Sequence, residues 1–263
     1  MSPNSYIKTK TSEGVGRVTL CRPDVANALN TEMIHELDVA FRSFEKDMTI
    51  RVILLEGQGK NFCAGADLDD IRQGGQNSTK ALKQLSESLH NLILTVAQIR
   101  KPIVTLVGGV AAGAGLGLVL LSDLVISGEK AKYITAFTAA GLSPDSGLTW
   151  FLPRFIGLRK AKLLLMENRP LSSAEALEFG LVDRIVPDDE VQTSGFAEAL
   201  KLSRGPVLAY GKIKKLLNDS FERSLEEQLN EEATLIIQQS ISPEGREGLA
   251  AFFEKRRPNF EAI

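Results

Sequence analysis

Strand-like and helix-like segments alternate along residues 16–186 of this 263-residue chain, and this alternation constrains the fold more than any other feature. Strand-like stretches are short and rich in Val, Ile and Leu, and apolar residues at helical spacing separate most of them. Such alternation favours parallel pairing of the strands in an α/β fold. Strands are expected at residues 16–21, 51–56, 103–107, 123–127 and 181–186.

Several helices are expected between these strands and after them. Asn30 is a good N-cap, and the apolar residues that follow it recur at helical spacing. Ser172 and Glu175 form the pattern of a capping box for a later helix. Helices are further expected over residues 80–98 and 158–166, and in a short apolar segment that ends near residue 122.

From about residue 196 onward the pattern is only helical, and it is polar enough to pack on a neighbouring chain. We therefore expect a core over residues 1–195 and a helical oligomerisation region over residues 196–263. Residues 73–79 are polar and contain glycine, so this segment is expected to be mobile.

The composition argues against several classes of function. A net charge of −2 gives no basic field that would attract nucleic acid or an anionic membrane. Two cysteines are too few for a disulfide framework, and residues 1–10 are too polar for a signal peptide. The apolar stretch over residues 110–121 is short and interrupted by glycine, so no membrane span is expected. A cytoplasmic location fits these observations best.

Residues 61–67, Asn-Phe-Cys-Ala-Gly-Ala-Asp, form a turn of small residues after a buried strand. An exposed N–H at Ala66 would be able to bind a developing oxyanion. The alternative is a tight strand-to-helix turn with Asp67 as an N-cap, and the local sequence alone favours this alternative. Cys63 has no cationic neighbour in the sequence that would lower the pKa of its thiol, so it is expected to be inert.

A second glycine-rich loop, residues 108–117, leads into the short apolar helix. Free N–H groups at the start of that helix favour an anion or oxyanion near Ala114. A dinucleotide site is an alternative, but the run from Gly113 to Gly117 is G-x-G-x-G and not the G-x-G-x-x-G fingerprint. Glu129, at the end of the next strand, keeps that alternative open. Close packing of the helix, which glycine permits, is the structural alternative.

Residues 143–154 place one carboxylate, Asp145, between a proline and a turn of small residues. This carboxylate either performs proton transfer or caps a helix that begins near Ser146. A nucleophilic role for Ser146 would need a histidine base. The two histidines, His35 and His90, both fall within expected helices, so we expect no nucleophilic role for Ser146.

Taken together, these motifs resemble those of the crotonase, or enoyl-CoA hydratase/isomerase, family over nearly the whole chain. The matching motifs lie at residues 22–29, 62–67, 109–115, 123, 171–176, 180–182 and 254–258. The resemblance implies an α/β fold built as a spiral of ββα units, with a C-terminal helical region that forms trimers and often hexamers. It also implies an acyl-CoA thioester as substrate, and neither a metal nor a separate cofactor.

The resemblance assigns residues to the site. The N–H groups of Ala66 and Ala114 would hold the thioester oxygen while an enolate forms. Lys255, in a tail of mixed aromatics and cations that is most simply solvated, would reach the CoA phosphates from its own or a neighbouring subunit. The residues expected to contact substrate or CoA are Val25, Ala26, Ala64, Gly65, Asp67, Leu68, Gly113, Phe137, Pro144 and Lys255.

The resemblance does not fix the reaction. The two glutamates that hydratases use fall on Gly117 and Phe137, which hold no proton, so Asp145 is the carboxylate that remains. Residues 137–154 look most like the phenylacetate-catabolism branch, which rearranges 1,2-epoxyphenylacetyl-CoA and shifts Δ3 double bonds to Δ2. Leu148 departs from that branch, which usually has a second glycine there. We expect an isomerase with Asp145 as its only acid and base.

Three alternatives remain open. One is 2-enoyl-CoA hydration with Asp145 alone, and another is an acyl-CoA binding protein with little turnover. The third is a 4-halobenzoyl-CoA dehalogenase, in which Asp145 would attack the ring with help from His90. Against dehalogenation, Phe137 stands in place of a tryptophan and Ala66 in place of a bulky residue of the aromatic pocket.

Overall fold

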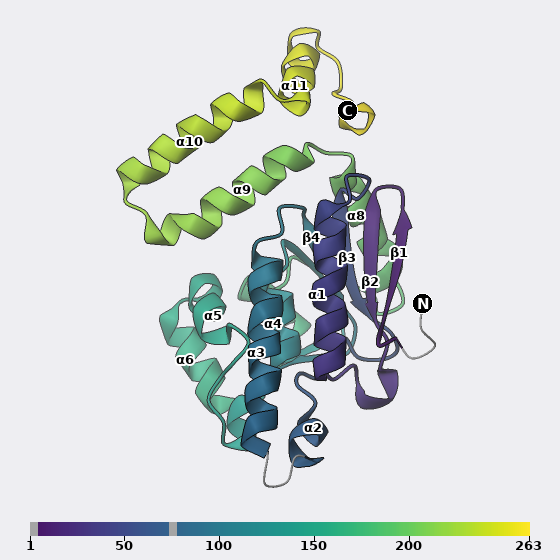
Figure 1. The fold of residues 1–263 in the computed structure, drawn as a ribbon, viewed down its shortest axis with the longest axis vertical. Helices are drawn as coiled ribbons and strands as arrows, with labels where there is room; N and C mark the ends of the chain where they lie inside the picture. The colour runs from purple at the N-terminus through teal and green to yellow at the C-terminus, as the bar shows by residue number, and fades with distance from the viewer. Residues whose placement is uncertain (1–4, 74–77) are drawn as a thin grey trace.

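Two β-sheets form the centre of the structure, a computed structural model that describes residues 5–73 and 78–263 (Figure 1). The larger sheet has the strand order β1-β2-β3-β4-β6-β9, and the smaller has the order β5-β7-β8. In the larger sheet β1 pairs antiparallel with β2, and all later pairs are parallel. Their bounds are β1 Ile7–Ser12, β2 Val15–Leu20, β3 Val52–Gly57, β4 Ile103–Val107, β5 Val110–Ala112, β6 Leu124–Gly128, β7 Lys132–Ile134, β8 Leu171–Ser172 and β9 Arg184–Val186.

The order of the larger sheet follows the order of the chain, without the reversal that creates the nucleotide crevice of a doubly wound fold. The dinucleotide interpretation that depended on Glu129 is therefore wrong. The expected strands at 16–21, 51–56 and 103–107 are confirmed as β2, β3 and β4, each within one residue. The expected strand at 123–127 is confirmed as β6, and β9 is shorter than expected.

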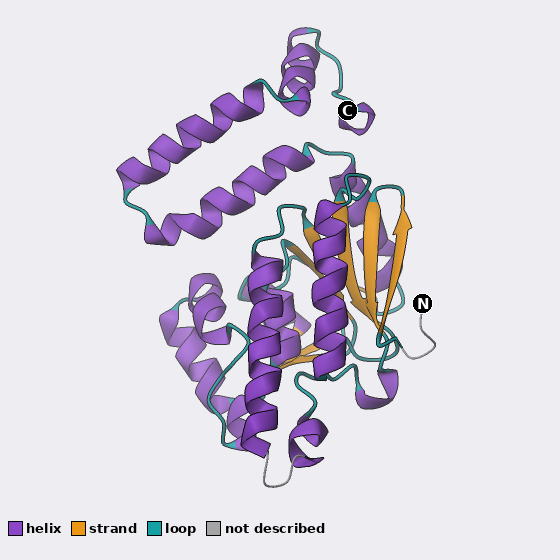
Figure 2. Ribbon diagram, in the orientation of Figure 1, coloured by secondary structure: helices purple, strands orange, loops and turns teal. Residues whose placement is uncertain are grey.

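The helices cover the larger sheet on both faces (Figure 2). Helices α1, Thr31–Lys46, and α3, Ser78–Ala97, pack against each other, and α8, Val191–Ser203, contacts β3, β4 and β6. As expected, Asn30 caps α1: its side-chain oxygen accepts the Met33 N–H at 2.9 Å, a contact worth about 1 kcal/mol. The remaining core helices are α2 Leu68–Gln73, α4 Ala114–Leu120, α5 Leu148–Ile156, α6 Leu158–Glu167 and α7 Ser173–Glu178.

Three C-terminal helices project beyond this core: α9 Val207–Asp219, α10 Leu225–Ser240 and α11 Pro243–Phe253 (Figure 1). Lys214 of α9 holds them to the core through its ammonium, 2.6 Å from Oδ2 of Asp123. The expected boundary after residue 195 falls inside α8, which packs on the sheet through Gly195, so the projecting part begins with α9. The division into two regions stays a prediction.

Two further expectations concern a membrane span and the mobility of residues 73–79. Within residues 5–73 and 78–263, no helix is long and apolar enough to cross a bilayer. The segment 73–79, expected to be mobile, consists largely of residues 74–77, which lie outside the described residues.

Candidate active site

The two loops of small residues lie side by side, because backbone hydrogen bonds join them. The Cys63 N–H donates to the Val110 carbonyl at 3.0 Å, and the Ala112 N–H donates to the Cys63 carbonyl at 2.9 Å. A Cβ on Gly65 would lie 2.9 Å from the Ala112 carbonyl oxygen and 3.4 Å from the Ala114 nitrogen. Glycine is needed at position 65 for this approach, which brings both expected donor loops into one site.

The N–H groups of Ala66 and Ala114 have no hydrogen-bond partner among the residues that the structure describes, although Ala114 is buried. Ala114 is the first residue of α4, and the first N–H groups of a helix have no acceptor within it. Two unpaired N–H groups on adjoining loops are what an oxyanion hole requires.

The segment expected to contact CoA lies against the first loop. The Ala64 N–H donates to the Ala26 carbonyl at 2.9 Å, so residues 25–26 lie beside Ala64, whereas Gly65 and Asp67 of the same loop are buried. Val25 and Leu68 expose their side chains, at 46% and 53%. The structure thus brings together these expected CoA contacts.

Two other side chains of the first loop are structural. Oδ1 of Asp67 accepts the Asp69 N–H at 3.2 Å, which confirms the expected cap of α2, and Oδ2 pairs with the Arg22 guanidinium at 2.8 Å. Burial raises the pKa of the Cys63 thiol to about 12, so this thiol stays protonated, which confirms the expectation that it is inert.

The glycines of α4 let other segments pack directly on the helix. Gly113 lies against Gly65, and Gly115 lies against the Cys63 backbone. At Gly117 a Cβ would lie 2.7 Å from the Ser146 carbonyl oxygen and 2.9 Å from the Ser146 Cβ. The expected packing role of these glycines is confirmed, and it seats the Asp145 segment one helical turn from Ala114.

Asp145 does not cap a helix, so the structural alternative for this residue is wrong. Helix α5 begins at Leu148, with Gly147 as its N-cap and no side-chain cap. The Asp145 carboxylate turns instead toward α3, where Oδ2 accepts the Ser86 hydroxyl at 2.8 Å and Oδ1 lies 2.7 Å from Nε2 of His90. The Asp145 side chain is 27% exposed, so it is open to a ligand.

Ser86 is a site residue that the sequence did not single out. It lies four residues before His90, on the same face of α3, and this spacing was the available signal. The dehalogenase alternative linked His90 to Asp145, but nothing in the sequence linked Ser86 to Asp145, which is 59 residues away.

Ser146 has a structural role. Its backbone is left-handed, with φ at +61°, and its N–H donates to Oδ1 of Asp145 at 2.5 Å. Its buried hydroxyl has no hydrogen-bond partner among the described residues. Since Nε2 of His90 faces Asp145, Ser146 has no base, and the structure gives no support to the nucleophile interpretation.

The remaining expected site residues fall in two places. The half-buried Phe137 begins the short 3-10 helix Phe137–Ala140, and its ring approaches Gly113, while Pro144 adjoins Asp145. Lys255 follows α11, at the opposite end of the molecule from α2 (Figure 1). Within one chain, Lys255 is therefore not brought to the other site residues.

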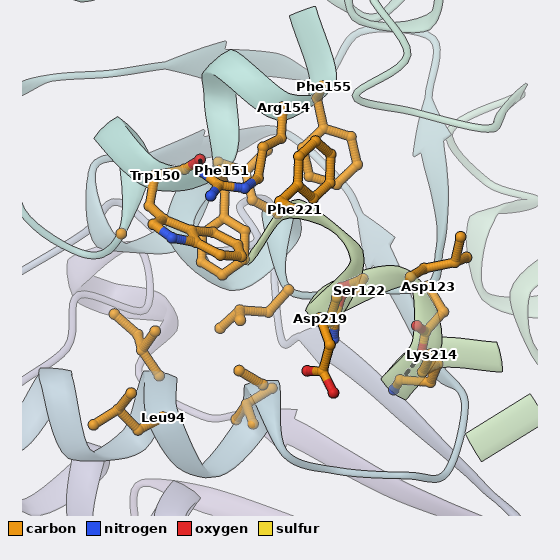
Figure 3. Close-up of a pocket in the computed structure, with 18 of the residues that line it drawn as sticks. Leu94, Ser122, Asp123, Trp150, Phe151, Arg154, Phe155, Lys214, Asp219 and Phe221 are labelled. Carbon is orange, nitrogen blue, oxygen red and sulfur yellow. Dashed lines mark hydrogen bonds and ion pairs between the residues drawn. The ribbon is translucent and has the colours of Figure 1, made fainter. Parts of the chain in front are cut away.

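A separate pocket of about 670 Å³ lies between α3, α5 and α9 (Figure 3). Trp150, Phe151 and Arg154 line one side, and the Arg154 guanidinium stacks 3.6 Å from the centre of the Trp150 ring. Gly147 lines this pocket, but none of the residues expected to bind substrate or CoA does. We therefore place the candidate active site at the two loops and Asp145.

Comparison with protein families matches residues 10–262 to the model described as "Enoyl-CoA hydratase/isomerase". A protein of Rhodobacter capsulatus named probable enoyl-CoA hydratase is 38% identical over 97% of both chains. The 1,2-epoxyphenylacetyl-CoA isomerase of Escherichia coli is 36% identical, over 97% of this chain and 98% of its own. A 4-chlorobenzoyl coenzyme A dehalogenase of Arthrobacter sp. is 30% identical, over 97% and 94%.

The fold is similarly close to solved structures. An enoyl-CoA hydratase from Polaromonas sp. JS666 superposes with a TM-score of 0.92 at 30% identity, covering 96% of this chain and 98% of the other. The crotonase fold expected from the sequence motifs is thus confirmed.

Proposed function

The chain belongs to the enoyl-CoA hydratase/isomerase family, and we propose that within this family it is an acyl-CoA isomerase with Asp145 as its single acid and base. The observation that supports this proposal most is the position of the Asp145 carboxylate. It serves no helix cap, remains partly exposed, and lies in a segment packed one turn from Ala114.

The proposed reaction moves one proton. With a 3-enoyl-CoA bound, the Asp145 carboxylate takes a proton from C2, and the electrons spread over the dienolate and the thioester oxygen. The N–H groups of Ala66 and Ala114 bind that oxygen, each lowering the barrier by about 3 kcal/mol. The Asp145 carboxyl then returns the proton to C4, which leaves the double bond between C2 and C3. Every atom of the substrate is kept, and no cofactor takes part.

Packing at Gly117 supports isomerisation over hydration by two glutamates. The family's first hydratase glutamate would stand at this position, where any Cβ would collide with Ser146. The second would stand at Phe137, whose aromatic ring carries no proton. Asp145 is then the carboxylate left for proton transfer at this site.

The test is to incubate the purified protein with a 3-enoyl-CoA and to follow the 2-enoyl product, with 1,2-epoxyphenylacetyl-CoA in parallel. We expect turnover of at least one, and a loss of about 10²- to 10⁴-fold in kcat for Asp145→Asn. Water addition to crotonyl-CoA at a higher rate would favour the hydratase instead. If Asp145→Asn turns over substrate as fast as the wild type, Asp145 is not the acid and base of the reaction.

Dehalogenation is a second candidate, since His90 contacts Asp145 as a helper of a nucleophilic aspartate should. The dehalogenase relative adds to this case. Phe137 and Ala66 argue against it, since Phe137 replaces the tryptophan and Ala66 replaces a bulky residue of the aromatic pocket. Release of chloride from 4-chlorobenzoyl-CoA would decide for dehalogenation, and we expect none. Binding of CoA thioesters without turnover of any of these substrates would identify a binding protein.

We further propose that CoA lies along residues 25–26 and 64–68, and that Lys255 reaches its phosphates from a neighbouring subunit. Helix α11, which Lys255 follows, lies at the opposite end of the molecule from α2 (Figure 1), so contact from the neighbour accounts for the expected role of Lys255. The proposed assembly is a homotrimer or a dimer of trimers.

A further inference from the structure

Three hydrogen-bond donors surround the Asp145 carboxylate. Oδ2 accepts the Ser86 hydroxyl at 2.8 Å, while Oδ1 accepts the Ser146 N–H at 2.5 Å and lies 2.7 Å from Nε2 of His90. A carboxylate oxygen accepts, so the His90 nitrogen that faces it is the protonated one. Ser86 is thus the donor to the oxygen that neither His90 nor Ser146 contacts.

The donors come from two separate elements. Ser86 and His90 lie one turn apart on α3, whereas Ser146 belongs to the segment that precedes α5. Rotation of the carboxylate about its Cβ–Cγ bond would break the contacts of both oxygens at once. Loss of the Ser86 contact would leave donors on Oδ1 alone, so the carboxylate would be held less firmly against this rotation.

A hydroxyl suits the position beside Oδ2 of Asp145 better than a group that can only donate a hydrogen bond. It donates to Oδ2 while Asp145 is ionised, and it can rotate to accept when Oδ2 carries the proton. The Ser86 oxygen also lies 3.4 Å from Nε2 of His90. Rotation of the hydroxyl moves only its hydrogen, so the Ser86 oxygen stays beside both Asp145 and His90. Both protonation states of Asp145 can therefore be held with the heavy atoms in place.

We propose that Ser86 is a positioning residue that holds Oδ2 of Asp145 in line with the substrate during both proton transfers. This inference rests on the proposed isomerase function. Ser86 would touch Asp145 and not the substrate, so its removal should slow the chemical step and leave substrate binding nearly unchanged.

The kinetic test compares Ser86→Ala, Ser86→Thr and a matched control, Ser88→Ala, with the wild type. Ser88 lies on the same helix and makes no side-chain hydrogen bond among the described residues. We expect Ser86→Ala to lower kcat for 3-enoyl-CoA on the order of 10- to 100-fold, with KM changed less than about twofold. Ser86→Thr should recover most of the loss, and Ser88→Ala should match the wild type. A kcat of Ser86→Ala within about twofold of wild type, or no recovery with threonine, would overturn the proposal.

A second readout does not depend on turnover. The chain contains two histidines, so ¹⁵N-labelled histidine gives two imidazole spectra, and a His35→Gln variant assigns them. We expect Ser86→Ala to move the Nε2 resonance of His90, as Asp145→Asn should, because the carboxylate that His90 faces is no longer fixed. An unchanged resonance in Ser86→Ala contradicts the proposal. If the wild type converts neither 3-enoyl-CoA nor 1,2-epoxyphenylacetyl-CoA, the proposed function fails, and this spectrum alone decides the role of Ser86.

Discussion

Asp145 shows at the scale of one residue what sequence can and cannot supply. Its type and its place after Pro144 predicted a carboxylate with either a capping or a chemical role. The sequence could not decide between them, because the deciding contacts come from Ser86 and His90, more than fifty residues away. The left-handed backbone of Ser146 could not be predicted from the sequence either, since serine has no preference for that conformation.

Glu247 gives a pH-dependent prediction at the same scale. Hydrogen bonds from Arg256, and then from the Asn259 N–H, lower the pKa of its carboxyl from an ordinary 4.5 to about 2. A carboxyl whose pKa is lowered by folding stabilises the native state above its unfolded pKa, and this contribution is lost as pH falls from 4.5 toward 2.

Thermal unfolding of wild type and Glu247→Gln over pH 2–7 would measure this contribution. We expect a constant difference in Tm above about pH 5 that shrinks toward zero near pH 2. A difference independent of pH would mean that the ion pair with Arg256 is not formed in solution.

At the scale of elements, helix α4 joins the parts of the site. Its N-cap glycine, Gly113, and its two glycines, Gly115 and Gly117, place it against the first loop and against Ser146. The sequence predicted the helix and the close packing, but not which segment meets each glycine. The strands β5, β7 and β8 were missed because two or three residues are too few for a periodic signal.

A methyl group at position 117 tests this packing. We expect Gly117→Ala to destabilise the protein by about 1–3 kcal/mol and to lower kcat, because the added Cβ displaces Ser146 and with it Asp145. Gly108→Ala is the matched control, since a Cβ there meets nothing within 4 Å. Equal stability and activity in the two variants, measured by urea unfolding and by isomerase assay, would contradict the packing argument.

At the scale of the whole molecule, the projecting helices expose many large apolar side chains. On α10 and α11 they are Leu225, Leu229, Ile236, Ile237, Leu249, Phe252 and Phe253, exposed between 49% and 77%. Exposed apolar side chains in such number are typical of interaction surfaces, which supports the proposed assembly. The helical pattern indicated a region that packs on a neighbour, and only the family resemblance gave an expected number of copies, three or six.

We expect light scattering after gel filtration to give three or six times the chain mass of 28.6 kDa. Ile237→Asp should shift the protein toward smaller species, because a charge would replace an apolar contact between copies. Met48→Asp should leave the mass unchanged, because Met48 is exposed on the N-terminal region and not on the projecting helices. A monomer at micromolar wild-type concentration would rule out the proposed assembly.

The contact between Gly117 and Ser146 also has an evolutionary consequence. A glutamate at position 117 and the present course of residues 145–147 exclude each other, because both need the same space. We therefore expect that a change from isomerase to hydratase rebuilds this loop before the glutamate is introduced, or together with it. The same order applies to redesign in the laboratory, where Gly117→Glu alone should yield a destabilised protein and not a hydratase.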